Sequence, residues 1–190
     1  AAPKLVNSIS RAVNLCESTL AFGKAEEPPP AMSRFMLASL VRDVIESEEI
    51  SAGEAKIDFV TDVPANLSIR ADHEQLHRVL TNLVRNAHQA IEATRQPGTI
   101  EIGAGDEDAG WWIRVGDTGP GLPERARDHL FQPFQGGMRK GGTGLGLAIA
   151  AELVRGHGGR LELVRSGPDG TEFVVHLPRE LALGELPRSA

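Results

Sequence analysis

Residues 72–95 read DHEQLHRVLTNLVRNAHQAIEATR and form the longest helical pattern in the chain. Apolar side chains recur along it every three or four residues, as on an α-helix that packs one face against a core. The residues on this face are Leu76, Val79, Leu80, Leu83, Val84, Ala87 and Ile91. Asp72 is a typical helix N-cap, and Pro97 and Gly98 stop the pattern. The stretch therefore predicts a long helix with one buried face.

Strand and helix patterns lie on both sides of this helix. Before it, we expect a helix from Ser39, its candidate N-cap, to about residue 53, and strands at 56–63 and 67–70. After it, the expected strands are 99–104, 111–115, 160–165 and 172–177, the expected helices are 123–130 and 145–157, and the expected loops are 105–110 and 131–142. Because strands and helices do not alternate regularly, this order predicts a two-layer α+β sandwich rather than a doubly wound fold.

The first 34 residues stand apart from this domain. Residues 4–22 carry apolar positions at helical spacing, and the prolines at 28–30 then disfavour helix, so residues 23–34 are the expected linker. The apolar stripe fits two alternatives equally well: the helix folds back on the core, or it joins an intermolecular bundle. The expected organisation is a helix and linker over 1–34, a globular domain over 35–179 and a tail over 180–190.

Composition argues against several classes of protein. The net charge of −6 leaves no broad basic face for a phosphate backbone, so nucleic acid is not an expected partner. The single cysteine, Cys16, cannot form an intramolecular disulfide, which fits a reducing compartment. No apolar run approaches the roughly 20 residues that cross a bilayer. We expect a soluble, cytoplasmic piece, and leave open a parent protein anchored in the inner membrane through segments that this chain lacks.

Two asparagines lie one turn apart on the long helix. Asn82 and Asn86 share a helix face, where carboxamide oxygens can contact a hard cation and nearby phosphates. The alternative is a pair of polar residues on the solvent side. Asparagine is unfavourable in the middle of a helix, and this favours a functional role.

A glycine-rich segment, Gly142-Thr-Gly-Leu-Gly-Leu147, opens a later helix. Glycine lacks a Cβ and lets the backbone approach a phosphate, whose charge the N–H groups of the following helix favour. The segment is not a Walker loop, because no Lys-Ser or Lys-Thr pair follows it, and similar segments are often only tight turns.

Asp117-Thr-Gly-Pro-Gly121 follows a predicted strand. The carboxylate of Asp117 could accept hydrogen bonds from an exocyclic amine such as that of adenine. Taken alone, an Asp-x-Gly segment is more often a turn capped by its own aspartate.

Five segments resemble, in their order along the chain, the motifs of the histidine kinase catalytic domain. They are the segment with Asn82 and Asn86, Asp117–Gly121, Phe131-Gln-Pro-Phe134, Gly142–Leu147 and Gly170-Thr-Glu-Phe173. The same GHKL superfamily includes gyrase, ATP-dependent chaperones and mismatch-repair ATPases, but Phe-x-Pro-Phe before the glycines resembles the kinase branch. The resemblance implies the Bergerat ATP-binding fold, a mixed sheet covered on one face by helices. Residues 4–36 resemble the second helix of the kinase dimerisation hairpin and its linker.

The resemblance also implies roles for individual residues. Asn86 would hold Mg²⁺ between the phosphates, with Asn82 beside it and Arg85 or Gln89 near the phosphate chain. Asp117 would bind the adenine amine, with Thr171 supporting it through a water. The remaining nucleotide contacts would come from Gly119, Gly121, Leu122, Gly142, Thr143, Gly144, Leu145, Gly146 and Leu147.

Residues 122–141 would form the ATP lid, with Phe131 and Phe134 anchoring its start. Arg139 or Lys140 would reach the γ-phosphate; we choose Lys140, although a solvated lid charge fits equally well.

The function implied is transfer of the ATP γ-phosphoryl group to a histidine, mainly by positioning and charge neutralisation. That histidine is expected on a helix absent from this chain, because the segment from His73 to His77 carries Gln75 where the family's acceptor motif has an apolar residue. Expected partners are ATP or ADP, a response regulator and a second copy in the full-length parent. The alternatives are an ATPase or serine kinase of the same fold, or a scaffold that binds nucleotide without catalysis.

Overall fold

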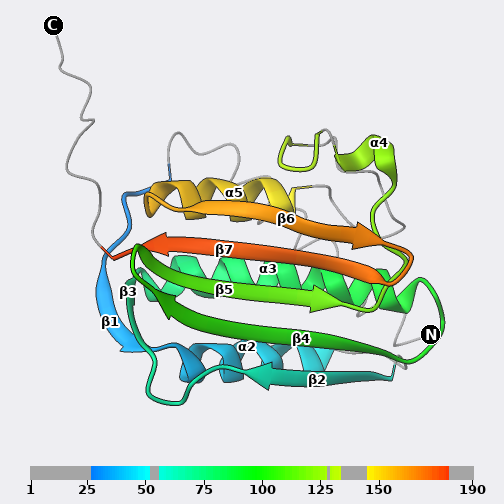
Figure 1. Cartoon of the computed structure of the whole chain (residues 1–190), viewed down its shortest axis with the longest axis horizontal. Helices are drawn as coiled ribbons and strands as arrows, with labels where there is room; N and C mark the ends of the chain where they lie inside the picture. The colour runs from blue at the N-terminus through cyan, green and yellow to red at the C-terminus, as the bar shows by residue number, and fades with distance from the viewer. Residues whose placement is uncertain (1–26, 52–55, 128, 134–144, 180–190) are drawn as a thin grey trace, which may run out of the picture.

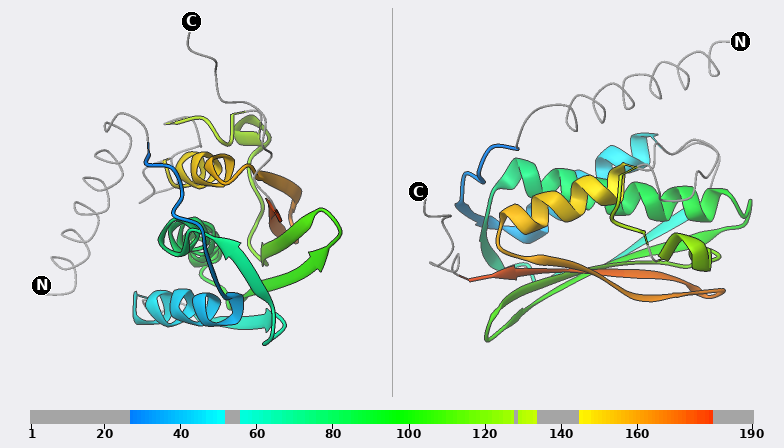
Figure 2. Two further views of the ribbon diagram at one scale, coloured as in Figure 1. Left: turned by 90° about the vertical axis from the view of Figure 1, so that its left-hand side faces the viewer. Right: turned by 90° about the horizontal axis from the view of Figure 1, so that it is seen from above.

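A computed structural model describes residues 27–51, 56–127, 129–133 and 145–179. These residues form two layers, a twisted sheet and a layer of helices that covers one of its faces (Figures 1 and 2). The predicted α+β sandwich is therefore confirmed. The predicted N-terminal helix, the C-terminal tail and residues 128 and 134–141 of the predicted lid lie outside the described residues.

The main sheet has five strands in the spatial order β2-β4-β5-β7-β6. Their bounds are β2 Ile57–Asp62, β4 Gly98–Glu107, β5 Gly110–Asp117, β6 Arg160–Gly167 and β7 Gly170–Pro178. β2 runs parallel to β4, and the other neighbouring pairs are antiparallel, so the sheet is mixed. This topology places the end of β5 beside the start of β7.

The helix layer consists of α2 (Leu37–Ser51), α3 (His73–Glu92) and α5 (Gly146–Gly156), with α3 between the other two (Figure 2). Every residue of the apolar face predicted on α3 is at most 2% exposed. The side chain of Asp72 accepts a hydrogen bond from the backbone N–H of Gln75 at 2.9 Å, which confirms it as the N-cap. Burial of this face against the sheet is what holds the long helix in place.

A small second sheet pairs β1 (Ser33–Met36) with β3 (Ser68–Ala71) in antiparallel register. β1 was not predicted, and it crosses the expected boundary between linker and domain. Its residues are mostly exposed, so no apolar alternation marks it in the sequence. β1 is defined by its backbone pairing with β3 rather than by burial.

The start of α2 differs from the prediction. The helix begins at Leu37, two residues before Ser39, so Ser39 is not its N-cap. The backbone N–H of Leu37 instead donates to the carbonyl oxygen of Leu67 at 3.0 Å. A tertiary contact therefore satisfies the first N–H of this helix.

The predicted loop at 105–110 belongs largely to a longer hairpin. β4 continues to Glu107, which pairs with Gly110 at the start of β5. Gly105 lies within the strand, and a Cβ there would come 2.6 Å from the indole of Trp112. The glycine that suggests a turn in the sequence instead makes room for an aromatic ring.

The helix predicted at 123–130 is short. α4 spans Glu124–Arg127, and a turn follows in which the N–H of Gln132 donates to the carbonyl oxygen of His129 at 3.0 Å. Among the described helices, none has both the length and the apolar character needed to cross a membrane.

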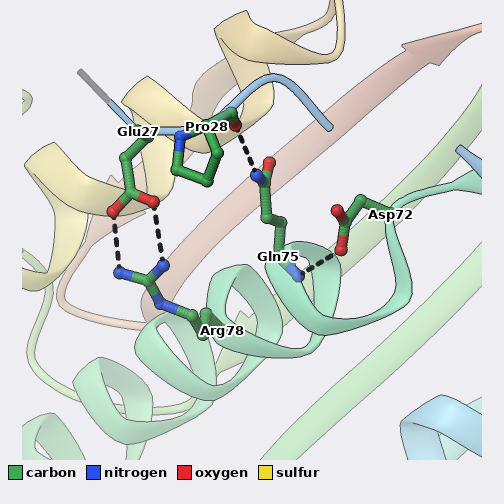
Figure 3. A network of polar contacts seen from close by, with 5 residues as sticks. All are labelled: Glu27, Pro28, Asp72, Gln75 and Arg78. Carbon is green, nitrogen blue, oxygen red and sulfur yellow. Dashed lines mark hydrogen bonds and ion pairs between the residues drawn. The ribbon is translucent and has the colours of Figure 1, made fainter. Parts of the chain in front are cut away.

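The end of the expected linker lies against the start of α3 (Figure 3). The guanidinium of Arg78 donates to both carboxylate oxygens of Glu27, at 3.2 and 3.0 Å. The side chain of Gln75 donates to the carbonyl oxygen of Pro28 at 2.9 Å, and the N–H of Ala31 donates to Asp72 at 2.7 Å. Polar contacts from Glu27, Pro28 and Ala31 therefore attach this segment to α3 and its N-cap.

Candidate nucleotide site

Packing of α3 against α5 brings two of the predicted motifs together. Asn82 and Asn86 are both half-buried on α3, and Gly146 is the first residue of α5. A Cβ at Gly146 would lie 3.4 Å from Oδ1 of Asn82, so this amide oxygen faces the start of α5. The asparagine pair and the end of the glycine-rich segment thus share one region of the fold.

The two helices begin differently. Asp72 caps α3, whereas the N-cap residue of α5 is Leu145, which is fully buried and provides no side-chain cap. The N–H groups of a first helical turn carry partial positive charge and need acceptors from outside the helix. The first turn of α5 is therefore a place that favours an anionic group such as phosphate.

Asp117 lies at the end of β5 and is only 6% exposed. Its Oδ1 accepts a hydrogen bond from the N–H of Gly119 at 2.7 Å, so the turn-capping alternative is realised. Thr171, the predicted supporting residue, is its register partner on β7 and is 1% exposed. The structure therefore places a buried carboxylate and a buried hydroxyl side by side on neighbouring strands.

The glycines after β5 allow close backbone approaches within the protein. A Cβ at Gly119 would lie 2.9 Å from Cβ of Ala90 on α3. Gly121 has a φ of +76° and lies against the backbone of Gly167, where a side chain would collide. These glycines seat the loop between α3 and the β6–β7 hairpin. Their expected approach to a base stays a prediction.

Two residues that contact this loop were not predicted from the sequence. The hydroxyl of Ser166 accepts from the N–H of Leu122 at 2.7 Å, and Arg127 donates to the carbonyl oxygens of Leu122 and Ser166 at 3.3 and 2.9 Å. A serine opening a turn often bonds a backbone group, which is the only sequence signal for Ser166. No sequence pattern around Arg127 indicates its contacts with the loop.

The start of the predicted lid packs against the sheet. The ring of Phe131 meets that of Phe173 on β7 edge-on, with centroids 6.5 Å apart. This agrees with the expected anchoring by Phe131. Among the residues given a role in the predicted site and lid, six lie outside the described ranges: Phe134, Arg139, Lys140, Gly142, Thr143 and Gly144.

Arg85 points toward α2 rather than toward α5. Its guanidinium lies 3.2 Å from the carboxylate of Glu48, whose side chain is 5% exposed. Gln89 is half-buried on α3. A phosphate contact by Arg85 would require it to leave Glu48. Within the described ranges, no group of three His, Cys, Asp or Glu side chains is placed to hold a metal.

A hollow of about 210 Å³ lies where β5 begins and β7 ends. Its lining includes Trp111, Arg160 and His176 and contains none of the predicted site residues. It lies at the opposite end of β5 from Asp117, so it is separate from the candidate site.

Comparison with known proteins identifies the family. The family described as "Histidine kinase-, DNA gyrase B-, and HSP90-like ATPase" matches residues 71–181. The nitrogen regulation protein NtrY of Azorhizobium caulinodans is 32% identical over 157 residues, which cover 80% of this chain and 20% of NtrY. The chain thus spans about a fifth of the length of this relative.

Solved structures agree with this match. The catalytic domain of histidine kinase ThkA, in a nucleotide-free form, is 33% identical with a TM-score of 0.60, over 78% of this chain and 97% of that domain. ThkA in complex with the response regulator protein TrrA is 29% identical with a TM-score of 0.68, over 94% of this chain and 50% of that one. The chain therefore belongs to the family of histidine kinase-, DNA gyrase B- and HSP90-like ATPases, within which it corresponds to the catalytic domain of a sensor histidine kinase.

Proposed function

We propose that this domain binds ATP with Mg²⁺ between α3, the start of α5 and the loop after β5. It then transfers the γ-phosphoryl group to a histidine outside the domain. The observation that carries the proposal is the position of Asn82 Oδ1 against Gly146, because it brings a cation-binding residue type to the first turn of a helix, which favours phosphate. Asp117 at the end of β5 supplies a buried acceptor for an adenine amine.

The side chains present fit a magnesium ion that is shared with phosphates. Asn86 is half-buried one turn beyond Asn82, and its neutral amide oxygen is a ligand of the kind that Mg²⁺ accepts. Magnesium commonly takes one or two protein oxygens and completes its shell with phosphate oxygens and waters. Bound there, the ion would neutralise phosphate charge during transfer.

We further propose that a response regulator receives the phosphoryl group from the modified histidine. The complex of ThkA with TrrA supports this partner, since ThkA contains a catalytic domain similar to this chain. A second copy of the parent protein would present the acceptor helix, and any membrane attachment would come from other parts of that parent.

Calorimetric titration with a non-hydrolysable ATP analogue tests nucleotide and metal binding together. We expect binding that is at least tenfold tighter with Mg²⁺ than with chelator, and a smaller difference in Asn86→Ala. Asn66→Ala, which removes an exposed asparagine outside the site, is the matched control and should behave as the unmodified protein. Equal affinity with and without Mg²⁺ would show that Asn86 has no role in metal binding.

Transfer itself is tested in the longer parent protein. Incubation with ATP carrying an isotopic label on the γ-phosphate should label a histidine, and the label should be lost in the parent that carries Asn86→Ala. ATP hydrolysis without protein labelling would favour an ATPase, and binding without either reaction would favour a scaffold.

A further inference from the structure

Both backbone polar groups of Leu122 are held by side chains from other elements. Its N–H donates to the hydroxyl of Ser166 at the end of β6, at 2.7 Å. Its carbonyl oxygen accepts from the guanidinium of Arg127 on α4, at 3.3 Å. Leu122 directly follows the glycine loop after Asp117, so these bonds act at the point where that loop leaves the site.

The same two side chains are also linked to each other. Arg127 donates to the carbonyl oxygen of Ser166 at 2.9 Å, so Ser166 uses both its hydroxyl and its carbonyl in this cluster. One residue earlier, Gly121 lies directly against the backbone of Gly167. The loop is thereby attached to the β6–β7 hairpin at two successive residues.

The hairpin in turn is attached to Asp117. Gly170, at the start of β7, has a φ of +127° and lies against the carbonyl oxygen of Asp117, and Thr171 pairs with Asp117 in the sheet. Asp117 and Leu122 are thus held by opposite ends of one tight turn. The distance between the buried carboxylate and Leu122 is set by the hairpin rather than by the flexible glycines between them.

We propose that Ser166 and Arg127 are positioning residues that hold Leu122, and with it the Gly119–Leu122 loop, in the conformation that receives the base. This inference rests on the proposed nucleotide site. The side chains of Ser166 and Arg127 bond to backbone atoms, so the two residues act through the loop. A loop that is ordered before binding gives up less conformational freedom when the nucleotide arrives, and this favours affinity.

The experiment combines ATP affinity with hydrogen exchange in Ser166→Ala, Ser166→Thr and Arg127→Ala. Affinity is read from displacement of a fluorescent ATP analogue, and exchange at the Leu122 amide is followed without nucleotide. We expect Ser166→Ala and Arg127→Ala to weaken ATP binding about threefold to tenfold, as for one lost hydrogen bond. In Ser166→Ala the Leu122 amide should also exchange faster by a similar factor. Ser166→Thr keeps the hydroxyl and should restore both values.

Arg155→Ala is the matched control, because Arg155 is an exposed arginine on α5 whose side chain pairs with Glu152. It should change neither value. If Ser166→Ala does not fold, Arg127→Ala, at an exposed residue, still decides the question. An unmodified protein that binds no nucleotide would refute the proposed function. Normal ATP binding in both variants would refute the positioning role while leaving the nucleotide site intact.

Discussion

The backbone N–H of Asp72 donates to Nε2 of His157 at 3.0 Å, across 85 residues of sequence. Because this nitrogen accepts a hydrogen bond, the ring proton lies on Nδ1, which is 2.8 Å from the carbonyl oxygen of Leu153. The imidazole is 1% exposed and joins the start of α3 to the end of α5. These are the two helices that carry Asn82 and Gly146.

Replacing His157 by phenylalanine keeps an aromatic ring but leaves the Asp72 N–H without its acceptor. A buried donor without a partner costs about 1–3 kcal/mol, so His157→Phe should lower the free energy of unfolding by that amount. Urea denaturation measures it. The control is His129→Phe, at an exposed histidine, which should change stability by less than about 0.5 kcal/mol. Equal stability of the two variants would show that the bond contributes nothing.

Asp72 should make stability depend on pH. Burial raises the pKa of its carboxyl, but hydrogen bonds from the N–H groups of Gln75, Ala31 and Glu74 outweigh burial and leave the pKa below its ordinary value. A lowered pKa means that the folded protein favours the ionised form. The resulting stabilisation is complete above the ordinary pKa, about 3.9, and is lost as the pH falls through the lowered pKa.

Asp72→Asn keeps a capping side chain without the charge. The unmodified protein should therefore be more stable than Asp72→Asn near pH 6, and the difference should shrink as the pH falls below about 4. Denaturation of both proteins across this range gives the difference. A gap that stays constant down to about pH 2.5 would mean that the carboxyl pKa is not lowered by folding.

The ion pair between Arg85 and Glu48 allows a structural role of Arg85 to be tested separately from its predicted phosphate contact. Arg85→Ala leaves the carboxylate of Glu48 buried without its partner, and we expect a loss of about 1–3 kcal/mol in unfolding free energy. Adding Glu48→Gln removes the charge and should restore most of that stability. Restored ATP affinity in the double variant would contradict the predicted phosphate contact of Arg85, whereas affinity that stays low would support it.

The sequence predicts best where burial follows a regular period. The apolar face of α3 and the cap at Asp72 were both predicted, because helical spacing and capping chemistry are local properties. The extension of the hairpin to Glu107 was not predicted, because a glycine at position 105 suggests a turn in the sequence. In the structure, Gly105 lies in the strand and makes room for the ring of Trp112. β1 was missed for the related reason that its partner, β3, lies about 35 residues away in the chain.

The candidate site shows the same limit. Asn82 and Asp117 could be chosen from the sequence because each lies within a motif. The fold brings Asn82 to the start of α5, next to the end of the glycine-rich segment, as expected if both motifs serve one site. Arg85 also lies within a motif, yet its direction depends on Glu48, a buried acid on α2 that no pattern linked to it. Ser166 and Arg127 were missed because their bonds are to backbone atoms, and the bonds that involve Ser166 join positions 44 and 39 residues apart in the chain.

The role of Asp117 in reading adenine is the central claim, and base specificity tests it. Adenine presents an amine donor where guanine presents a carbonyl acceptor. With guanine bound, the carboxylate of an ionised Asp117 would therefore face the guanine carbonyl, and neither group could donate a hydrogen bond. Such a mismatch at a buried carboxylate costs roughly 1–3 kcal/mol, which corresponds to about a tenfold preference for ATP. Asp117→Asn should reduce this preference, because its amide can donate to the guanine carbonyl.

The most direct measurement is competition of ATP and GTP against a fluorescent ATP analogue bound to the unmodified protein in the presence of Mg²⁺. The proposed site requires ATP to displace the analogue at a concentration at least about tenfold lower than GTP does. Equal displacement by the two nucleotides would contradict the assignment of Asp117 and the adenine site built on it.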